Sequence, residues 1–444
     1  MSSQEKITYI ASPGGELSGE IHVPGDKSIS HRSIMLGSLA NGTTHISGFL
    51  QGEDSLATLN AFRSMGVFIE GPDQEGNVTI EGVGMHGLKE PGQPLNLGNS
   101  GTSMRLLTGL LAAQDFDLEL IGDESLSSRP MKRVTMPVKE MGAIVETAEN
   151  NTAPLKIKGG NQLKGIAYSL PMASAQVKSC ILLAGLYAKG KTCVTEPAPT
   201  RDHTERMLQG FGYEVEVNNL GEGKSQICLD GGGELKACDL HVPADISSAA
   251  FFMVAACIAE NSELLLKHIG INPTRIGIVN ILKQMGADIS LQNEKVVGGE
   301  PVADILVRSS QLQGIDIPED QVPLAIDEFP VIAVAAACAE GKTVLTGAEE
   351  LRVKESDRIQ AMVDGLTSLG IHCEGTDDGM IVWGGEIGGG QVDSLGDHRI
   401  AMSFAVAALR ASETIEILDC ANVNTSFPGF VELAGSCGMR VEIA

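Results

Sequence analysis

The chain of 444 residues is longer than one compact core usually supports, which favours two or more domains. With 43% hydrophobic residues and nine irregularly spaced cysteines, we predict neither a zinc site nor a disulfide framework. The net charge of −25 argues against nucleic acids and anionic membranes as partners, since both bind basic surfaces.

The N-terminal residues and the apolar stretches of the chain predict a cytoplasmic location. Residues 1–6 are polar and lack the apolar core of a signal peptide. The longest apolar stretches, residues 249–259 and 331–339, are too short to cross a bilayer. We therefore expect a cytoplasmic protein in reducing surroundings, without a membrane partner.

One pattern recurs six times along the chain. A helix-like segment ends in an apolar residue followed by Gly, and a strand-like run comes next. Gly suits this place because helices commonly end in a left-handed residue. Chance would not place a strand pattern after every such Gly. The six residues, spaced by 68 to 84 positions, are Gly66, Gly142, Gly212, Gly286, Gly370 and Gly438.

A second, apolar helix recurs at a similar interval and opens with polar residues. The segment from His22 to Asp26 is echoed by the segment from His241 to Asp245, close to half the chain away. The repeat is too long for most solenoids. The six openings lie near Asp26, Asn99, Ser174, Asp245, Asp327 and Asp397.

These repeats predict an α/β fold with two similar globular domains, each of three strand–helix–strand–helix repeats. We expect a discontinuous domain of residues 1–22 plus 242–444 and a second domain of residues 23–241.

Two nucleotide-binding patterns are misleading. Residues 82–87 match the dinucleotide fingerprint, but the Pro- and Gly-bearing segment that follows cannot open a helix. Residues 185–192 match the phosphate-binding loop, yet a helix precedes them and a strand follows, which reverses the required order. We expect neither segment to bind a nucleotide.

The openings in the first half carry cations, hydroxyls and amides. Unpaired amides and the helix dipole make helix N-termini attractive to anions, and a nearby cation strengthens such a site. Taken alone, each opening could equally be a capped helix with solvated charges. The candidate residues are Lys27, Ser28, Arg32, Asn99, Gly101, Arg129, Ser174, Gln176 and Arg201.

The openings in the second half add carboxylates. Asp327 precedes an apolar helix and could be a general base or only a cap. Lys354, Glu355 and Arg358 belong to the densest charged cluster of the chain, and Arg399 begins the last small-residue helix. Together the openings could hold two anionic substrates and move protons between them.

Several segments resemble the signature segments of the 5-enolpyruvylshikimate-3-phosphate (EPSP) synthase family, in order and over nearly the whole chain. The resemblance implies the enolpyruvyl transferase fold, an inside-out α/β barrel in two hinged domains, with the active site in the interdomain cleft. The segments are residues 24–32, 98–105, 352–358 and 397–402, and residues 129–131 and 174–178 are similar to the class II bacterial branch.

The resemblance implies transfer of the enolpyruvyl group of phosphoenolpyruvate to the 5-hydroxyl of shikimate 3-phosphate, with release of phosphate and without metal or cofactor. Asp327 would take the proton of the 5-hydroxyl, Glu355 would protonate the methylene carbon, and Lys27 is a rival proton donor. Lys354 would lie near that hydroxyl. Shikimate 3-phosphate would contact Ser28, Arg32, Ser174 and Gln176, and phosphoenolpyruvate Gly101, Arg129, Arg358 and Arg399, with Lys27 between the two.

The sequence departs from the class I pattern in two places. Glu350-Leu351 replaces an Asn-Trp pair, and residues 425–428 lack a Lys before Phe-Pro, so one phosphoenolpyruvate contact is absent or supplied elsewhere. Gly101 is retained where some class II enzymes carry Ala. We therefore expect glyphosate, a competitor at the phosphoenolpyruvate site, to inhibit.

Two alternatives stay open. A UDP-amino-sugar enolpyruvyl transferase shares the fold but usually has a Cys on a mobile loop of its first half, whereas residues 121–129 contain none. A non-catalytic anion-binding protein on the same scaffold should lack acid and base residues, whereas Lys27, Asp327 and Glu355 are present. We expect a monomer, since the domains need freedom to close.

Overall fold

The computed structural model describes residues 7–221 and 223–444. The chain packs as two compact units, each built from more than one stretch of sequence. Unit 1 contains Met1–Pro24, Pro243–Val296 and Glu300–Ala444, and unit 2 contains Gly25–Val242 and Val297–Gly299. The expected division was residues 1–22 plus 242–444 against residues 23–241. In the structure, residues 23–24 pack with unit 1, and residues 242 and 297–299 pack with unit 2.

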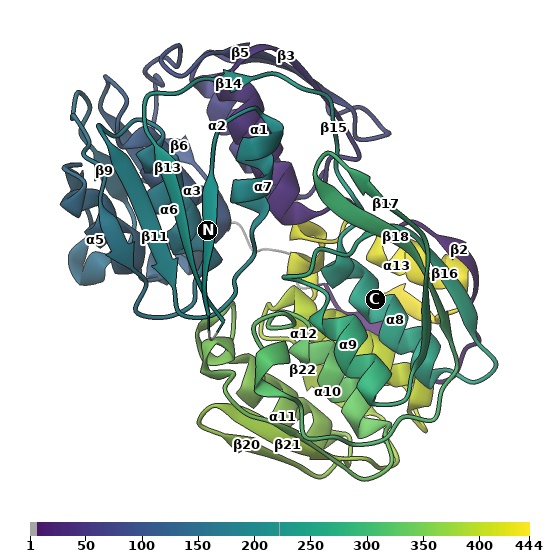
Figure 1. Cartoon of the computed structure of the whole chain (residues 1–444). Coiled ribbons are helices and arrows are strands. Elements are labelled where there is room, and N and C mark those ends of the chain that lie inside the picture. Colours follow the sequence, from purple (N-terminus) through teal and green to yellow (C-terminus); the bar gives the residue numbers. More distant parts are fainter. Residues whose placement is uncertain (1–6, 222) are drawn as a thin grey trace. The chain divides into compact units, whose positions relative to one another are not determined.

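The elements of unit 2 alternate between helices and short strands, coloured purple to teal in Figure 1. In chain order they are α1 (Lys27–Leu39), β3 (Ala40–Ser47), α2 (Glu53–Ser64), β4 (Phe68–Glu70), β5 (Val78–Val83), β6 (Leu95–Asn96), α3 (Gly101–Leu111), β7 (Leu118–Ile121), α4 (Glu124–Ser128), α5 (Lys132–Glu140), β8 (Val145–Glu146), the 3-10 helix η1 (Glu149–Asn151), β9 (Leu155–Ile157), β10 (Ala167–Ser169), α6 (Ala175–Gly185), β11 (Lys191–Glu196), α7 (His203–Gly210), β12 (Glu216–Gly221), β13 (Lys224–Asp230), β14 (Leu235–Lys236) and β15 (Leu240–His241).

Unit 1 is built in the same manner and has the longer strands. Its elements are β1 (Tyr9–Ala11), β2 (Ser18–Ile21), α8 (Ile246–Ile258), β16 (Glu263–Gly270), α9 (Gly277–Gln284), β17 (Asp288–Val297), β18 (Glu300–Arg308), η2 (Glu319–Gln321), α10 (Phe329–Ala337), β19 (Lys342–Leu345), η3 (Glu349–Val353), α11 (Arg358–Ser368), β20 (Cys373–Thr376), β21 (Gly379–Trp383), β22 (Gly390–Asp393), α12 (His398–Ala407), η4 (Ala408–Arg410), β23 (Ile415–Leu418), η5 (Ala421–Thr425), α13 (Phe430–Cys437) and β24 (Val441–Ile443).

The six predicted helix stops are confirmed. Each Gly comes just after a helix and has its own backbone in the left-handed region, where a side chain would be strained. The strand that follows each Gly is β4, β8, β12, β17, β20 or β24. The φ angles are 85° at Gly66, 105° at Gly142, 78° at Gly212, 95° at Gly286, 88° at Gly370 and 115° at Gly438.

The described residues form six small sheets, and several of them share one pairing pattern. In the sheet β10-β11-β13-β12, the first pair is parallel and the other two pairs are antiparallel. The same pattern recurs in β6-β7-β9-β8 and in β22-β23-β1-β24. The strand after each Gly is thus half of an antiparallel pair, so each repeat contains more strands than the predicted strand–helix–strand–helix unit.

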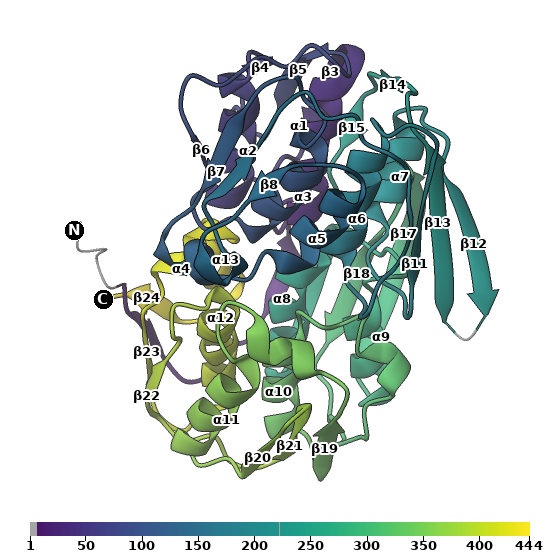
Figure 2. The same cartoon turned by 90° about the vertical axis from the view of Figure 1, so that its left-hand side faces the viewer.

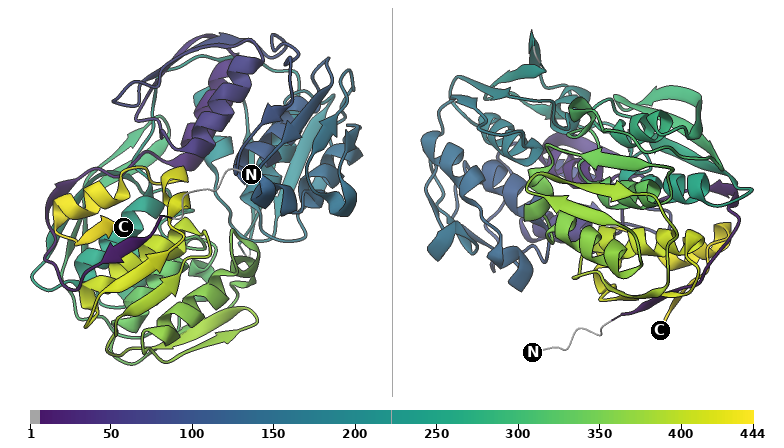
Figure 3. Two further views of the ribbon diagram at one scale, coloured as in Figure 1. Left: turned by 180° about the vertical axis from the view of Figure 1, so that it is seen from behind. Right: turned by 90° about the horizontal axis from the view of Figure 1, so that it is seen from below.

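Strands from the ends of each unit complete its sheets. β1 lies between β23 and β24, so the N-terminal strand is the middle strand of a C-terminal sheet. Figure 3 shows this purple strand among the yellow ones. In unit 2, β14 and β15 at the end of the unit pair in parallel with β3 near its start. These pairings join the first and last segments of each unit, which lie far apart in sequence, within one sheet.

Three central helices form the interior of each unit. α8, α10 and α12 pack against one another in unit 1, and their side chains are buried almost all round, as expected for helices that are apolar on every face. In unit 2 the corresponding helices are α1, α3 and α6. Figure 2 labels all three among the elements of this unit. The described sheets stay open, so the inside-out arrangement consists of buried helices flanked by separate sheets.

One cysteine pair differs from expectation. Cys193 on β11 and Cys228 on β13 are opposite each other in the antiparallel register and are joined by a disulfide. The prediction of no disulfide framework misses this bond, because 35 residues separate the two cysteines and only the strand pairing brings them together.

Neither nucleotide-binding pattern has the surroundings that such a site needs. The segment from Gly82 to Gly87 ends in a turn without a helix, and residues 185–192 run from α6 into β11, so both nucleotide-binding patterns lack the required context. Within residues 7–221 and 223–444, no helix is both long and apolar enough to span a membrane. The same residues contain no group of three or more His, Cys, Asp or Glu side chains placed to hold a metal ion.

Candidate active site

Each predicted polar opening lies at the start of a central helix. At five of the six, the residue before the helix accepts a hydrogen bond from the first turn, which satisfies an otherwise unpaired amide. The distance from Oδ1 of Asp26 to the backbone N of Ile29, for example, is 2.8 Å. The capping residues are Asp26, Ser100, Ser174, Asp245 and Asp397, whereas Glu328 before α10 makes no side-chain cap.

Arg32 on α1 is held from two other helices. Its Nε donates to Oγ1 of Thr204 on α7 at 2.7 Å, and its NH2 donates to Oγ of Ser179 on α6 at 2.8 Å. Its NH1 donates to the carbonyl of Ser28 at 2.9 Å. The guanidinium is therefore fixed at the helix start that also carries Ser28, as a phosphate site requires.

Lys27 forms an ion pair with Asp54, in the first turn of α2. Both side chains are largely covered, with 26% of the Lys27 and 10% of the Asp54 side chain exposed. The carboxylate of Asp54, which the sequence did not single out, thus orients the ammonium at the start of α1.

Gln176 connects α6 to α3. Its Nε2 donates to Oγ1 of Thr102 at 3.1 Å, and its Oε1 accepts from NH1 of Arg105 at 2.6 Å. Ser174 caps α6 two residues before Gln176, and Arg201 lies in the loop between β11 and α7. Ser174 and Gln176 therefore lie at the same helix start, as predicted.

Asn99 and Arg129 are brought together before α3. NH2 of Arg129 donates to Oδ1 of Asn99 at 2.6 Å, and Nδ2 of Asn99 donates to Asp123 at 2.8 Å. Gly101 is the first residue of α3. A Cβ at this position would lie 3.1 Å from NH1 of Arg105 and 3.3 Å from NH1 of Arg129, so Gly keeps two guanidinium groups close to the helix start.

His31 on α1 is fully buried near Lys27 and Arg32 and is expected to make the stability depend on pH. Its Nδ1 lies 2.7 Å from Oγ1 of Thr58. Burial, followed by the charges of Lys27 and Arg32, holds the pKa of His31 well below its usual value. The imidazole is therefore neutral in the fold but protonates in the unfolded chain below about pH 6.5.

The free energy of unfolding is thus expected to fall as the pH drops below about 6.5, by up to about 1.4 kcal/mol per pH unit from this group. Urea unfolding at pH 7.5, 6.5 and 5.5 measures this dependence. His31→Gln, whose amide can still bond Thr58, should lose part of the fall. His45→Gln, on an exposed position of β3, should retain it. Equal pH dependence in His31→Gln and the wild type would contradict the prediction.

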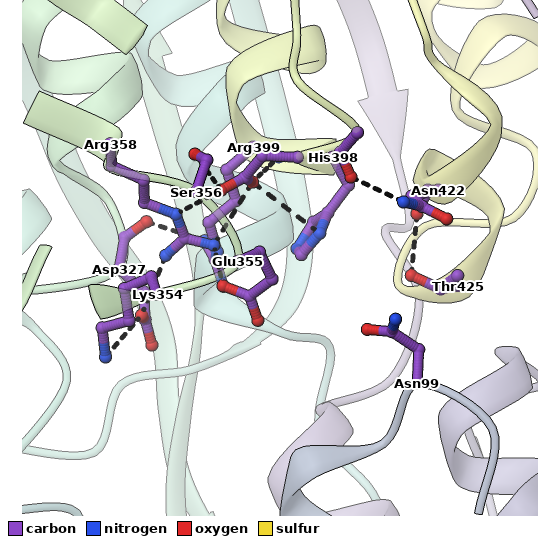
Figure 4. A network of polar contacts seen from close by, with 12 residues as sticks. Asn99, Asp327, Lys354, Glu355, Ser356, Arg358, His398, Arg399, Asn422 and Thr425 are labelled. Carbon is purple, nitrogen blue, oxygen red and sulfur yellow. Dashed lines mark hydrogen bonds and ion pairs between the residues drawn. The ribbon is translucent and has the colours of Figure 1, made fainter. Parts of the chain in front are cut away.

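Arg358 is the centre of the site in unit 1. Its side chain is 2% exposed, and its guanidinium faces three carboxylates (Figure 4). Nε donates to Asp397 at 2.8 Å, NH2 donates to Glu355 at 2.7 Å, and NH1 lies 3.4 Å from Oδ1 of Asp327. Burial opposes the charged form, but Asp397, Glu355 and Asp327 outweigh it and raise the pKa of Arg358 above its usual value.

Asp327 lies between two cations. Nζ of Lys354 is 3.5 Å from Oδ1 of Asp327, the same oxygen that faces Arg358. Lys354 also pairs with Glu350 at 2.9 Å. The Glu350-Leu351 departure noted in the sequence therefore supplies a carboxylate that helps to hold Lys354.

Arg399, at the start of α12, reaches across to α10. Its NH1 donates to the carbonyl of Asp327 at 2.9 Å and lies 3.7 Å from Oε1 of Glu328. Glu328 accepts a hydrogen bond from Ser247 on α8, and Arg275 donates to Ser247. The starts of α8, α10 and α12 thus meet in one polar network.

The other departure, residues 425–428, begins at the last residue of η5. Oγ1 of Thr425 donates to the carbonyl of Asn422 at 2.7 Å, and Nδ2 of Asn422 donates to the carbonyl of Gly396 at 2.6 Å (Figure 4). This segment, where class I enzymes carry a Lys, is held by neutral hydrogen bonds.

The arrangement gives each unit a distinct chemical capacity. In unit 2, buried or partly buried cations lie beside hydroxyl and amide groups at helix starts, a combination that binds phosphate or carboxylate. In unit 1, carboxylates that can exchange protons lie against Lys354, Arg358 and Arg399, which can hold an anion. The residue roles assigned from the sequence stay predictions.

Sequence reasoning missed several residues of these clusters. Glu328 stood next to Asp327 and could have been noticed as a second carboxylate at the same helix start. Arg105 lies within the marked segment of residues 98–105, and Ser247 follows the opening at Asp245, but neither residue was singled out. Asp54 and Arg275 lie outside the marked segments, and only packing brings them to this polar network.

Comparisons with known proteins indicate the same family over nearly the whole chain. The model of the family "EPSP synthase (3-phosphoshikimate 1-carboxyvinyltransferase)" matches residues 11–433. The 3-phosphoshikimate 1-carboxyvinyltransferase of Methylococcus capsulatus is 64% identical over 438 residues, covering 99% of both chains. That of Alkalilimnicola ehrlichii is 66% identical over 430 residues, covering 97% of this chain and 95% of its own.

Solved structures indicate the same fold. The EPSP synthase structure from Acinetobacter baumannii has a TM-score of 0.89 at 58% identity, covering 99% of this chain and 100% of its own. The enolpyruvyl transferase NikO from Streptomyces tendae has a TM-score of 0.77 at 16% identity, over 99% of each chain, and so shares the fold. With the predicted helix starts, the six repeats and these relatives in agreement, the chain belongs to the EPSP synthase family.

Proposed function

We propose that this protein transfers the enolpyruvyl group of phosphoenolpyruvate to the 5-hydroxyl of shikimate 3-phosphate and releases phosphate. The observation that carries the proposal is the placement of Asp327 against Lys354 and Arg358, with Glu355 on the same guanidinium. This cluster offers a proton acceptor, a proton donor and cations for an anionic substrate in one place. The identity to relatives that carry this name supports the same substrates.

The chemistry divides into addition and elimination. Asp327 accepts the proton of the 5-hydroxyl while that oxygen forms a bond to C2 of phosphoenolpyruvate and Glu355 protonates C3. In the second step the C2–O bond to phosphate breaks, and Glu355, now ionised, takes a proton back from C3. The departing phosphate takes up the proton that Asp327 removed from the 5-hydroxyl, so both carboxyl groups return to their starting states. Arg358 and Arg399 stabilise the charge on the carboxylate and the departing phosphate. Lys27 remains a rival proton donor in either step.

We propose that unit 2 supplies the contacts to shikimate 3-phosphate. Arg32 and Lys27 are the cations at the start of α1, and Ser174 and Gln176 are the hydroxyl and amide at the start of α6. Arg201 adds a cation from the neighbouring loop. The reaction requires the two substrates to be held in contact and shielded from water.

We further propose a monomeric, cytoplasmic enzyme of aromatic amino-acid biosynthesis that uses no metal or organic cofactor. The reaction exchanges one C–O bond for another without an electron acceptor, so the side chains named above suffice. Sedimentation of the protein with and without substrates tests the monomer.

Phosphate release tests the function. The protein is incubated with phosphoenolpyruvate alone, with shikimate 3-phosphate added, or with a UDP-amino sugar in its place. Release only with shikimate 3-phosphate is the expected result. Release with the UDP-amino sugar would identify the sister transferase, and binding of both proposed substrates without release would identify a binding protein.

Glyphosate at millimolar concentration is expected to inhibit the wild type in competition with phosphoenolpyruvate. Gly101→Ala should raise the glyphosate inhibition constant by about tenfold or more, because the methyl group would press against Arg105 and Arg129. Inhibition kinetics against phosphoenolpyruvate measures both effects. Gly92→Ala, where an added Cβ meets nothing within 4 Å, is the matched control. Unchanged activity of the wild type at millimolar glyphosate would contradict the prediction.

A further inference from the structure

Unit 2 contains a buried ion triad that the proposed chemistry does not use. Nζ of Lys178 on α6 lies 2.9 Å from Oε2 of Glu196 and 2.7 Å from Oε1 of Glu205. The side chains are only 1%, 6% and 4% exposed, respectively. A buried ammonium with two carboxylates is costly to desolvate, so its retention in the core calls for a structural reason.

The triad is held together by charge. Burial opposes the charged form of Lys178, but Glu205 and Glu196 outweigh it and raise the pKa of the ammonium above its usual value. Glu205 also lies in the first turn of α7, where the helix dipole favours a negative charge. Lys178 is thus a permanent cation on which two separate elements depend.

Each member of the triad adjoins a candidate substrate contact. Lys178 lies on α6 two residues after Gln176. Glu196 ends β11 and also accepts from Oγ1 of Thr200 at 2.7 Å, which fixes the loop immediately before Arg201. The ammonium therefore ties the start of α6 to the loop that carries Arg201.

Glu205 makes the corresponding connection to Arg32. Ser179 and Thr204 are the sequence neighbours of Lys178 and Glu205, and their hydroxyls lie 2.7 Å apart. Both hydroxyls accept from the guanidinium of Arg32, at 2.8 and 2.7 Å. The position of α6 against α7 thus sets the direction of Arg32.

We infer that Lys178 is a positioning residue that, through Glu196 and Glu205, holds Arg32, Gln176 and Arg201 in the geometry that binds the phosphate-bearing acceptor. The inference rests on the proposed function, because it assigns these contacts to shikimate 3-phosphate. Lys178 itself is too deeply buried to touch a substrate.

The test compares Lys178→Met with a charge-compensated double variant. Lys178→Met leaves two buried carboxylates without their cation, whereas Lys178→Met with Glu205→Gln removes one of these charges but does not restore the tie. The control is Lys191→Met, a change on β11 that removes an exposed ion pair with Glu216 on β12. Calorimetry measures the Kd of shikimate 3-phosphate without phosphoenolpyruvate, kinetics give kcat and both KM values, and urea unfolding gives stability.

Both Lys178 variants are expected to raise the Kd and KM for shikimate 3-phosphate by about 10- to 100-fold, since a shift near 1 Å in a binding group has effects of this size. The kcat at saturation and the KM for phosphoenolpyruvate should stay within about threefold. The double variant should regain stability without regaining affinity. A double variant with wild-type affinity would overturn the inference, and it also decides the question if Lys178→Met does not fold.

The wild type separates this inference from the proposed function. If the wild type neither binds shikimate 3-phosphate nor releases phosphate with it, the proposed function fails. If the wild type does both and the Lys178 variants keep its affinity, only the positioning role fails.

Discussion

Asp327→Asn is expected to lower kcat by about 100- to 10,000-fold, the usual contribution of a general base, with the KM of either substrate changed by less than about threefold. Asn keeps the volume of the side chain but cannot accept the proton of the 5-hydroxyl. The carboxylate it replaces lies 3.5 Å from Lys354 and 3.4 Å from Arg358, where its position is already fixed. Initial rates of phosphate release at saturating substrates measure the effect.

Asp320→Asn is the matched control for this change. Asp320 is an exposed carboxylate in η2 of the same unit, so its loss should leave kcat and stability unchanged. A kcat of Asp327→Asn within about fivefold of the wild type would remove Asp327 as the base. Lys27 would then be the first residue to test in its place.

Arg358→Lys is expected to lower kcat/KM for phosphoenolpyruvate by about 1,000-fold or more and the free energy of unfolding by about 3 kcal/mol. Lysine keeps the positive charge but lacks the planar fork that donates to Asp397 and Glu355 while facing Asp327. Asp397, which is fully buried, would lose its Nε donor. Steady-state kinetics and urea unfolding on the same preparation separate the two effects.

Arg308→Lys provides the comparison for this variant. Arg308 pairs with Glu263 at the surface of unit 1, with 42% of its side chain exposed, so the same substitution should cost less than about 0.5 kcal/mol. If Arg358→Lys retained kcat/KM within about tenfold, the guanidinium would be a structural group and not a substrate contact.

The repeats and helix starts were predictable because they follow from local backbone chemistry. Gly at a left-handed position ends a helix wherever it occurs, and the six such residues are confirmed with positive φ. Polar residues before an apolar run cap a helix, so the openings at Asp26, Ser174, Asp245 and Asp397 are confirmed as well. The α/β fold class follows from these local signals and their spacing, whereas the family was indicated by the resemblance of particular segments and is shown by the relatives.

Pairings between distant segments could not be predicted in this way. The cysteines of the disulfide, the Lys178 triad and the insertion of β1 between β23 and β24 each join residues that no local pattern links. The sequence likewise counted too few strands in each repeat, since a strand that returns antiparallel carries no distinct period of its own.

The sequence by itself determined which residues stand at helix starts and which carry charge, and these properties identify the candidate site. Only the tertiary structure decided which partners those residues have: Asp54 for Lys27, Arg105 for Gln176, and three carboxylates for Arg358. The physical reason is the distance along the sequence over which each kind of interaction acts. Capping and helix termination act over about four residues, whereas ion pairs and buried hydrogen bonds depend on how packed helices bring remote side chains within a few ångströms.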